Sequence, residues 1–196
     1  MQRKKFDFIV SMIGVFLAVS FAVIGGMLTW GANFANTTVH DQLAAQKITF
    51  PPAGSDALKE PEIAAHLNQY AGQQLTTGAQ AEAYADHFIG VHVKGIASGK
   101  TYSEVSTEQM IVAGKLKADP NNAELQAQNA ALSGQKQALF MGETLRGLLL
   151  NAYAFSIFGQ IALYASYAAY AAAVILIVLA LLGLRHANTV DPRQRM

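Results

Sequence analysis

No charged side chain occurs in the stretch GLLLNAYAFSIFGQIALYASYAAYAAAVILIVLALLGL, which covers residues 147–184. As a single helix these 38 residues would be about 57 Å long, nearly twice the ~30 Å hydrocarbon core of a bilayer. Two spans would leave no residues for a turn between them, and a hairpin would place Arg185 outside, against the positive-inside rule. We therefore predict one helix, whose part at 161–184 spans the membrane and whose part at 145–160 extends beyond it.

Aromatic and polar residues in 145–160 indicate that this part of the helix lies outside the hydrocarbon core. Tyr153, Phe155 and Phe158 stand where the side chains of an interfacial aromatic belt are expected. Asn151 and Arg146 lie further from the predicted span, where they can reach water or protein. The apolar residues of this outer extension need a cover, and we predict that a helical extension of the other span provides it.

The other predicted span, at residues 8–30, contains 23 residues without an ionisable side chain. A helix of this length rises roughly 34 Å and crosses a bilayer with modest tilt. Because Arg3, Lys4 and Lys5 precede it, residues 1–7 and the tail at 185–196 are both predicted to lie in the cytoplasm. A cleaved signal peptide would have a shorter apolar segment and a cleavage motif of small residues after it. We therefore predict a two-pass protein of the plasma membrane.

Small residues recur at every fourth position in both predicted spans. Such rows let two helix backbones approach closely, which drives helix association where lipid is as apolar as the side chains. Glycine is also common in membrane helices in general. We predict a helix-packing interface, either between the two spans or with another protein, at Gly14, Ala18, Ala22, Gly26, Ala165, Ala169 and Ala173.

The segment between the spans differs from them in charge and pattern. Residues 31–144 contain seven lysines, no arginine and eleven acidic residues, a net charge of minus four. This balance agrees with a location outside the membrane, since basic residues are retained on the cytoplasmic side. We predict an extracytoplasmic helical domain that includes the helix extension at 31–46 and the start of the long last helix.

Helix signals recur along this domain. Helices are predicted at 61–71, at 79–96, after a capping box at 101–104 or a second one at 106–109, and from 120 or 121 into the last helix, with fraying near Gly134. Only KITF at 47–50 resembles a strand. The predicted fold class is an all-α membrane protein, with two long antiparallel transmembrane helices that extend outward into a small helical extracytoplasmic domain.

The predicted core of this domain is small. Its apolar anchors are Leu58, Ile63, Leu67, Tyr70, Tyr84, Phe88, Val91, Ile96, Tyr102, Val105, Met110, Ile111 and Leu116. Such a set favours a compact helical cap that packs on the two membrane-helix extensions. It does not favour a free-standing enzyme domain with a deep pocket.

Residues that the chain lacks exclude several classes of site. Without cysteine there is no disulfide, thiolate metal site or iron–sulfur cluster. Neither predicted span contains Asp, Glu, Lys, Arg or His, the groups that carry ions and protons or bind a haem within a bilayer. The net charge of +1 gives no indication of a nucleic-acid partner. We therefore expect no cofactor, and no transport of ions, protons or electrons by this chain alone.

Two motifs in the middle segment fail as catalytic or metal sites. GIASGKTY at 95–102 resembles a phosphate-binding loop, but the first glycine of that motif would fall at Lys94. His87 and His92 are five residues apart, so on a helix their rings would point about 140° from each other. Metal sites need three or four converging ligands. We predict no catalytic and no metal-binding residue, and expect that the chain is not an enzyme.

Three stretches carry a resemblance to a known group of proteins. These are YADHFIGVHV (84–93), GKTYSEV (99–105) and ETLRGLLLNAYAF (143–155), which follow a short basic start and a first span. With these features the chain resembles small actinobacterial two-span membrane proteins of unknown function. Its layout is similar to that of accessory subunits in the cytochrome bcc–aa3 respiratory supercomplex. The resemblance implies a cofactor-free subunit that stabilises a larger membrane assembly.

We therefore expect one of two functions. A third function, that of an enzyme using Asp86, His87 and His92, has the least support. The first is an accessory or scaffolding subunit that binds a larger membrane complex through a helix face and the outer domain. The alternative is a membrane protein that binds or senses a cell-envelope ligand. The alternative requires a pocket of several hundred Å³ lined by groups such as Tyr70, Tyr84 and Phe88.

Overall fold

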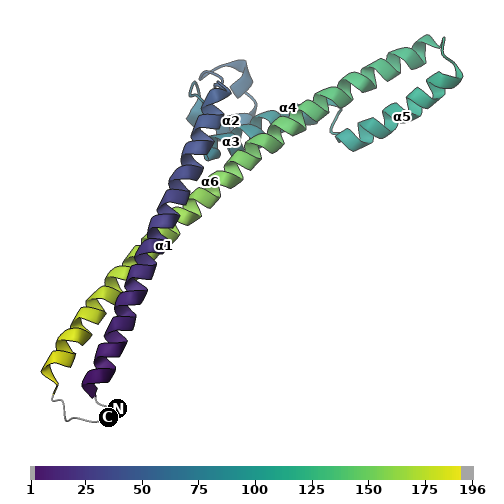
Figure 1. Ribbon diagram of the computed structural model, residues 1–196. Coiled ribbons are helices and arrows are strands. Elements are labelled where there is room, and N and C mark those ends of the chain that lie inside the picture. The colour runs from purple at the N-terminus through teal and green to yellow at the C-terminus, as the bar shows by residue number, and fades with distance from the viewer. Residues whose placement is uncertain (1–2, 191–196) are drawn as a thin grey trace. The chain divides into compact units, whose positions relative to one another are not determined.

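The computed structural model describes residues 3–190, and within that range the chain is helical, as predicted (Figure 1). Residues 1–2 of the predicted cytoplasmic start, and residues 191–196 of the predicted tail, lie outside the described residues. The elements are α1 (Arg3–Ala45), the 3-10 helix η1 (Asp56–Leu58), α2 (Pro61–Leu67), the 3-10 helix η2 (Asn68–Tyr70), α3 (Gly78–Tyr84), the π-helix η3 (Ala85–Ile89), α4 (Gly90–Ile96), α5 (Tyr102–Ala118) and α6 (Ala123–Thr189).

Helices α1 and α6 are long and apolar enough to cross a membrane. They contain 43 and 67 residues, and the most apolar 18-residue window of each has a mean hydropathy of 2.5. Only 17% of that window in α1 and 11% in α6 is buried inside the protein. An apolar helix in the core of a soluble protein would be mostly covered by other elements. The exposed apolar side chains on these two helices instead fit a lipid environment.

The chain divides into two compact units. Unit 1 contains the chain up to Thr37 together with the chain from Ile157 onward, and unit 2 contains Thr38–Ser156. Unit 1 therefore holds the apolar windows of α1 and α6. Unit 2 holds the last turns of α1, the short helices, α5 and the first half of α6.

Small buried residues recur at every seventh position along both helices of unit 1. Buried small residues are Ser11, Ala18, Gly25 and Ala32 on α1, and Gly159, Ser166, Ala173, Ala180 and Ala187 on α6. A seven-residue interval keeps one seam facing its neighbour along two nearly aligned helices. Small side chains at these positions allow the backbones to approach closely.

Glycines in unit 1 lie where the partner helix would meet a β-carbon. A β-carbon added to Gly25 would stand 2.7 Å from the Tyr170 ring, and one added to Gly14 would stand 3.3 Å from the β-carbon of Ala180. Gly183 in the same way faces the hydroxyl of Ser11. The Ser11 hydroxyl donates to the Asp7 carbonyl at 2.7 Å, so it is hydrogen-bonded within its own helix. The two helices are joined by this close packing and by two polar contacts, Thr29 Oγ1 to the Tyr170 hydroxyl at 3.3 Å and Asp7 Oδ2 to His186 Nε2 at 3.8 Å.

Unit 2 has two apolar clusters. The first surrounds Phe50, whose ring lies 5.3 Å from the rings of both Tyr70 and Tyr84 and is 1% exposed. The second joins α4 and α5 to α6 through Val105 and Leu139, among others. Of the predicted anchors, those fully buried are Leu58, Ile63, Leu67 and Val105.

Three predicted anchors of this core are wrong. Tyr102, Met110 and Ile111 are 40%, 61% and 55% exposed, although the Tyr102 ring lies 6.0 Å from the ring of Phe140 on α6. The second cluster is built instead from Val105 and Val112, seven residues apart on α5. The face of α5 that packs is thus set by β-branched residues, whereas the most apolar side chains stay exposed.

The expected helix limits are partly right. Positive φ angles of 72° at Gly72 and of 54° and 86° at Ser98 and Gly99 end the helical segments where stops were predicted. The helix predicted at 61–71 is α2 followed by η2, and the helix at 79–96 is interrupted by the π-turn η3. KITF forms one isolated bridge, Thr49 to Gln74, and no strand of its own.

Capping residues explain the two other differences. Thr101 and Glu104 form the predicted capping box of α5, so the second candidate start at 106–109 lies inside that helix and is wrong. Helix α6 begins at Ala123 because the Asn122 side chain accepts from the backbone N–H of Leu125 at 3.1 Å. It continues through Gly134 without the predicted fraying.

The capping box of α5 gives a pH prediction. Hydrogen bonds from the backbone N–H and hydroxyl of Thr101, at 2.7 and 2.8 Å, lower the pKa of Glu104 below its ordinary value of 4.5. Because the folded-state pKa is lower, the carboxylate stabilises the helix start above pH 4.5, and this contribution is lost as pH falls through the folded value.

We expect Thr101→Ala to raise the pKa of Glu104 part of the way toward 4.5, because the hydroxyl donor is lost while the backbone N–H remains. NMR titration of the Glu104 side-chain carboxyl carbon in the full chain measures this change. Thr107→Ala is the control, since its hydroxyl bonds the Ser103 carbonyl and leaves the box intact. An unchanged Glu104 titration in Thr101→Ala would refute the assignment.

Candidate functional site

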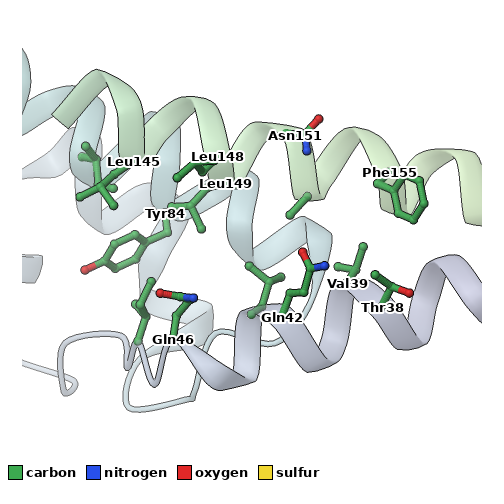
Figure 2. Close-up of a pocket in the computed structure, with 14 residues that line it drawn as sticks. Thr38, Val39, Gln42, Gln46, Tyr84, Leu145, Leu148, Leu149, Asn151 and Phe155 are labelled. Carbon is green, nitrogen blue, oxygen red and sulfur yellow. The ribbon is translucent and has the colours of Figure 1, made fainter. Parts of the chain in front are cut away.

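Unit 2 contains an apolar pocket of about 710 Å³. It lies between residues 38–48, which include the last turns of α1, and residues 145–155 of α6, with Tyr84 and Ile89 at one side. Figure 2 shows Gln42 and Phe155 reaching from the two helices into the space between them. Most of its lining is aliphatic or aromatic, and includes Val39, Leu43, Ile48, Leu145, Leu148 and Leu149.

The pocket lining holds no Asp, Glu, Lys, Arg or His. Its polar side chains are those of Thr38, Gln42, Gln46 and Asn151, together with the phenol of Tyr84. Burial raises the pKa of Tyr84 above its ordinary value, so the phenol is neutral at physiological pH. The pocket therefore offers apolar contact and neutral hydrogen-bonding groups.

Arg146 fixes one wall of this pocket. Its guanidinium donates to the Ala85 carbonyl at 3.2 Å, to Asp86 at 2.9 Å and to Glu143 at 2.8 Å. The hydrogen bond to Asp86 is the largest cause that raises the pKa of Arg146. These contacts tie α6 to the π-helix η3, a rare backbone form that often occurs at functional sites. Tyr84 and Ile89, at the two ends of η3, are thereby held at the pocket.

The close approach of η3 to Arg146 also depends on Gly90. A β-carbon at this position would stand 3.3 Å from the Arg146 Nε atom and 3.3 Å from the Ala85 carbonyl oxygen. Arg146 contacts protein, which agrees with the expectation that its side chain reaches water or protein. Its partners, Ala85 and Asp86, are about sixty residues away in sequence and could not be identified from local pattern.

Of the three aromatic residues expected around a ligand pocket, Tyr84 lines it. Tyr70 and Phe88 are not among its lining residues. Tyr70 packs on Phe50, and the Phe88 ring lies 4.8 Å from the Tyr84 ring and 4.6 Å from the His92 ring. Phe88 therefore packs on a lining residue, Tyr84, and Tyr70 packs on Phe50 in the core.

The histidines lie apart from the pocket. His92 Nδ1 lies 2.7 Å from the Phe88 carbonyl oxygen, and the His87 ring stacks on the His66 ring with their centres 3.4 Å apart. Among residues 3–190, no three His, Asp or Glu side chains converge as metal ligands. The stacking of His66 on His87 was not predicted, because it joins two helices that sequence spacing does not relate.

The predicted packing residues divide into two sets. Ala18, Ala169 and Ala173 are buried in unit 1, and Gly14 and Ala165 are partly buried. Ala22 and Gly26 are exposed, whereas Gly14 of the same row faces Ala180, so only part of this four-residue row contacts α6. Four residues turn a helix by about 400°, so such a row drifts around the helix by about 40° per step. Ala22 and Gly26 remain predicted contacts with another protein.

This register is tested by one matched pair of substitutions. We expect Ala18→Leu to lower the free energy of unfolding by about 1–2 kcal/mol, because an added side chain overfills the helix contact. Ala22→Leu makes the same chemical change on the exposed face and should be near neutral. Unfolding of the full chain in mixed micelles by SDS titration measures both. Equal effects would contradict the seven-residue register.

Comparisons with known protein families, with curated proteins and with solved structures gave no match. The chemistry of the site therefore has to be taken from its own residues. Neutral polar groups and apolar walls can bind an uncharged or amphiphilic molecule, and the lining contains no ionisable group besides Tyr84 for proton transfer.

Proposed function

We propose that the chain is a two-pass protein of the plasma membrane in which α1 and α6 are antiparallel transmembrane helices. Both termini are then cytoplasmic, and unit 2 is an extracytoplasmic domain. The basic start, the absence of arginine from 31–144 and the exposed apolar windows support this topology. The contacts of Gly14 with Ala180 and of Gly183 with Ser11 support the antiparallel direction, since residue numbers rise on one helix as they fall on the other.

Within this topology, the function that the geometry supports best is non-catalytic binding of a small apolar or amphiphilic ligand from the cell envelope. The observation that carries it is the pocket of about 710 Å³ in unit 2. Ligand sites in proteins are commonly concave, apolar and of roughly 300–1,000 Å³, with a few polar groups for orientation. The lining has this composition, with amide side chains beside leucine, isoleucine and phenylalanine.

Filling the pocket tests this function. Ala152 lines it and is partly buried, so Ala152→Phe should occupy part of its volume. Ala154→Phe makes the same change on the exposed side of α6. A bound ligand stabilises the folded state, so stripping small molecules from the full chain in detergent should lower the melting temperature of wild type and of Ala154→Phe. Ala152→Phe should be insensitive. The same response in all three proteins would contradict ligand binding.

The accessory-subunit function is a second proposal, supported by apolar side chains of unit 2 that nothing in the described chain covers. Met110, Ile111, Phe140 and Met141 are between 54% and 61% exposed on α5 and α6. Exposed apolar patches in a membrane-protein domain are common at contacts with other proteins. A larger membrane complex, such as an actinobacterial respiratory supercomplex, would cover them.

Co-purification tests this second proposal. A tagged chain extracted from native membranes in mild detergent should elute with a fixed ratio of the subunits of one complex, as identified by mass spectrometry. Met110→Glu with Phe140→Glu should abolish that association, while the fold of unit 2 is retained because both side chains are exposed. Elution of the wild-type chain alone would refute the proposal.

A further inference from the structure

The pocket in unit 2 selects against charged ligands. None of its lining residues is basic or acidic, and the neighbouring Arg146 is already held by Asp86 and Glu143. An ionised group placed in such a pocket would lose its hydration without gaining an opposite charge. The buried part of a ligand is therefore uncharged.

The pocket extends along residues 38–48 and along α6. One wall follows α1 from Thr38 to Leu43 and continues to Gln46 after the end of that helix. The other follows α6 from Leu145 to Phe155, a length of about 15 Å. Figure 2 shows Leu145, Leu148 and Phe155 in succession along one wall, with Val39, Gln42 and Gln46 along the other. An apolar pocket that extends along both helices can accept a hydrocarbon chain along its length.

Neutral polar side chains of the lining are available to bind the polar head group of such a ligand. The side chains of Thr38, Gln42, Gln46 and Asn151 make no hydrogen bond to any other group within residues 3–190 and are at least partly exposed. Amide and hydroxyl groups can both donate to and accept from hydroxyls and ester carbonyls. A head without charge is consistent with this lining, and an anionic phosphate would find no cation in it.

The two helices that line the pocket also contain the predicted membrane spans, which indicates that the ligand comes from the membrane. Thr38 stands eight residues after Trp30 on α1, and Phe155 stands six residues before Ile161 on α6, with both helices unbroken. Phe34 and Phe158, two exposed side chains of unit 1, lie between these positions in the sequence. Aromatic side chains of this kind gather at the membrane interface.

We propose that the pocket of unit 2 binds an acyl chain of a membrane lipid with an uncharged head, such as a diacylglycerol. This assignment rests on the proposed ligand-binding function and names the class of its ligand. The lipid places its hydrocarbon against the leucines of α6 and its head against the amides of α1. The neutral head distinguishes it from the anionic phospholipids that surround the spans.

Photocrosslinking tests the assignment. The full chain is reconstituted in nanodiscs with diacylglycerol, or with phosphatidylglycerol, that carries a diazirine in one acyl chain, and labelled peptides are mapped by mass spectrometry. Diacylglycerol should label 38–48 and 145–155, whereas phosphatidylglycerol should label the spans alone. Labelling of the pocket by both lipids to the same extent would overturn the selection for a neutral head.

A matched pair of variants separates the pocket from the surrounding surface. Leu148→Arg places a charge in the lining at a side chain that is 63% exposed, and should lower pocket labelling by diacylglycerol about tenfold or more. Met141→Arg, at a side chain 54% exposed on the same helix and outside the lining, should leave it unchanged. Equal labelling in both variants would overturn the assignment.

Native mass spectrometry of the full chain separates failure of this assignment from failure of the proposed function. A lipid of neutral head that remains bound to wild type and is lost from Leu148→Arg supports the assignment. A different small molecule retained in the same way overturns the lipid class while ligand binding stands. A wild-type chain with no bound small molecule, or with a protein segment crosslinked in the pocket, overturns both.

Discussion

Phe50→Ala is expected to lower the free energy of unfolding of unit 2 by about 3–5 kcal/mol. Phe50 is 1% exposed and its ring contacts the rings of Tyr70 and Tyr84. Its removal leaves a cavity between these two rings in the core of unit 2. Tyr84 also lines the pocket, so ligand binding should fall together with stability.

Hydrogen–deuterium exchange of the full chain in nanodiscs measures this effect, since it reports the opening of unit 2 and of the membrane helices separately. Phe140→Ala is the matched control, because it removes the same side chain from a site that is 58% exposed. It should change exchange in unit 2 by less than about 1 kcal/mol. If Phe50→Ala left exchange in unit 2 at the wild-type level, Phe50 would not be the centre of its core.

Arg146→Ala is expected to lower the free energy of unfolding of unit 2 by about 2–3 kcal/mol. Hydrogen bonds to charged groups are among the stronger ones, and this substitution removes three of them. The Arg146 side chain is 27% exposed, so solvent screens its contacts only in part. Without it, the Ala85 carbonyl in the π-helix loses its side-chain donor. We expect the π-helix η3 to exchange faster and the wall of the pocket to loosen.

Lys100→Ala is the control for charge and distance. Lys100 pairs with Glu108 at 2.7 Å, a distance as short as any made by Arg146, but both side chains are more than 40% exposed. An exposed pair of this kind contributes less than about 1 kcal/mol. Exchange rates at Ala85–Ile89 distinguish the two variants. If Lys100→Ala lowered the free energy of unfolding as much as Arg146→Ala does, then neither burial nor the contact with the Ala85 carbonyl would explain the effect of Arg146.

The helical class and the two apolar helices could be predicted from composition and length, because a charge-free run of more than 20 residues has few alternatives. The seven-residue row of buried small residues was not predicted. Ser11, Ala18 and Gly25 are as visible in the sequence as Gly14 and Ala22 are, and a search at an interval of seven would have found them. The predicted four-residue rows depend on the close approach of two backbones that small residues at this interval allow. Where two helices pack along a long interface, the contacting residues instead recur on average every 3.5 residues.

The core of unit 2 was predicted less well than its helix limits. Capping at Thr101 and the stops at Gly72 and Gly99 depend on neighbouring residues, so local pattern identifies them. Phe50 and Leu75 lie in connecting segments, where no periodicity marks a buried side, and both were missed.

The pocket could not be located from the sequence for the same reason. It forms where residues 38–48 meet residues 145–155, about a hundred positions later in the chain, and only Tyr84 of the three expected aromatic residues takes part. The polar residues Gln42, Gln46 and Asn151 have no spacing that relates them. Long-range contact therefore decides which side chains line it.

Labelling of single cysteines tests the proposed topology most directly, because the chain has no cysteine of its own. Ser133 in unit 2 and Asn188 near the end of α6 are both exposed, so each can be replaced by cysteine without loss of packing. On intact cells, a maleimide that cannot cross the membrane should label Ser133→Cys and spare Asn188→Cys until the cells are permeabilised. Labelling of Asn188→Cys on intact cells, or protection of Ser133→Cys, would contradict two spans with both termini in the cytoplasm.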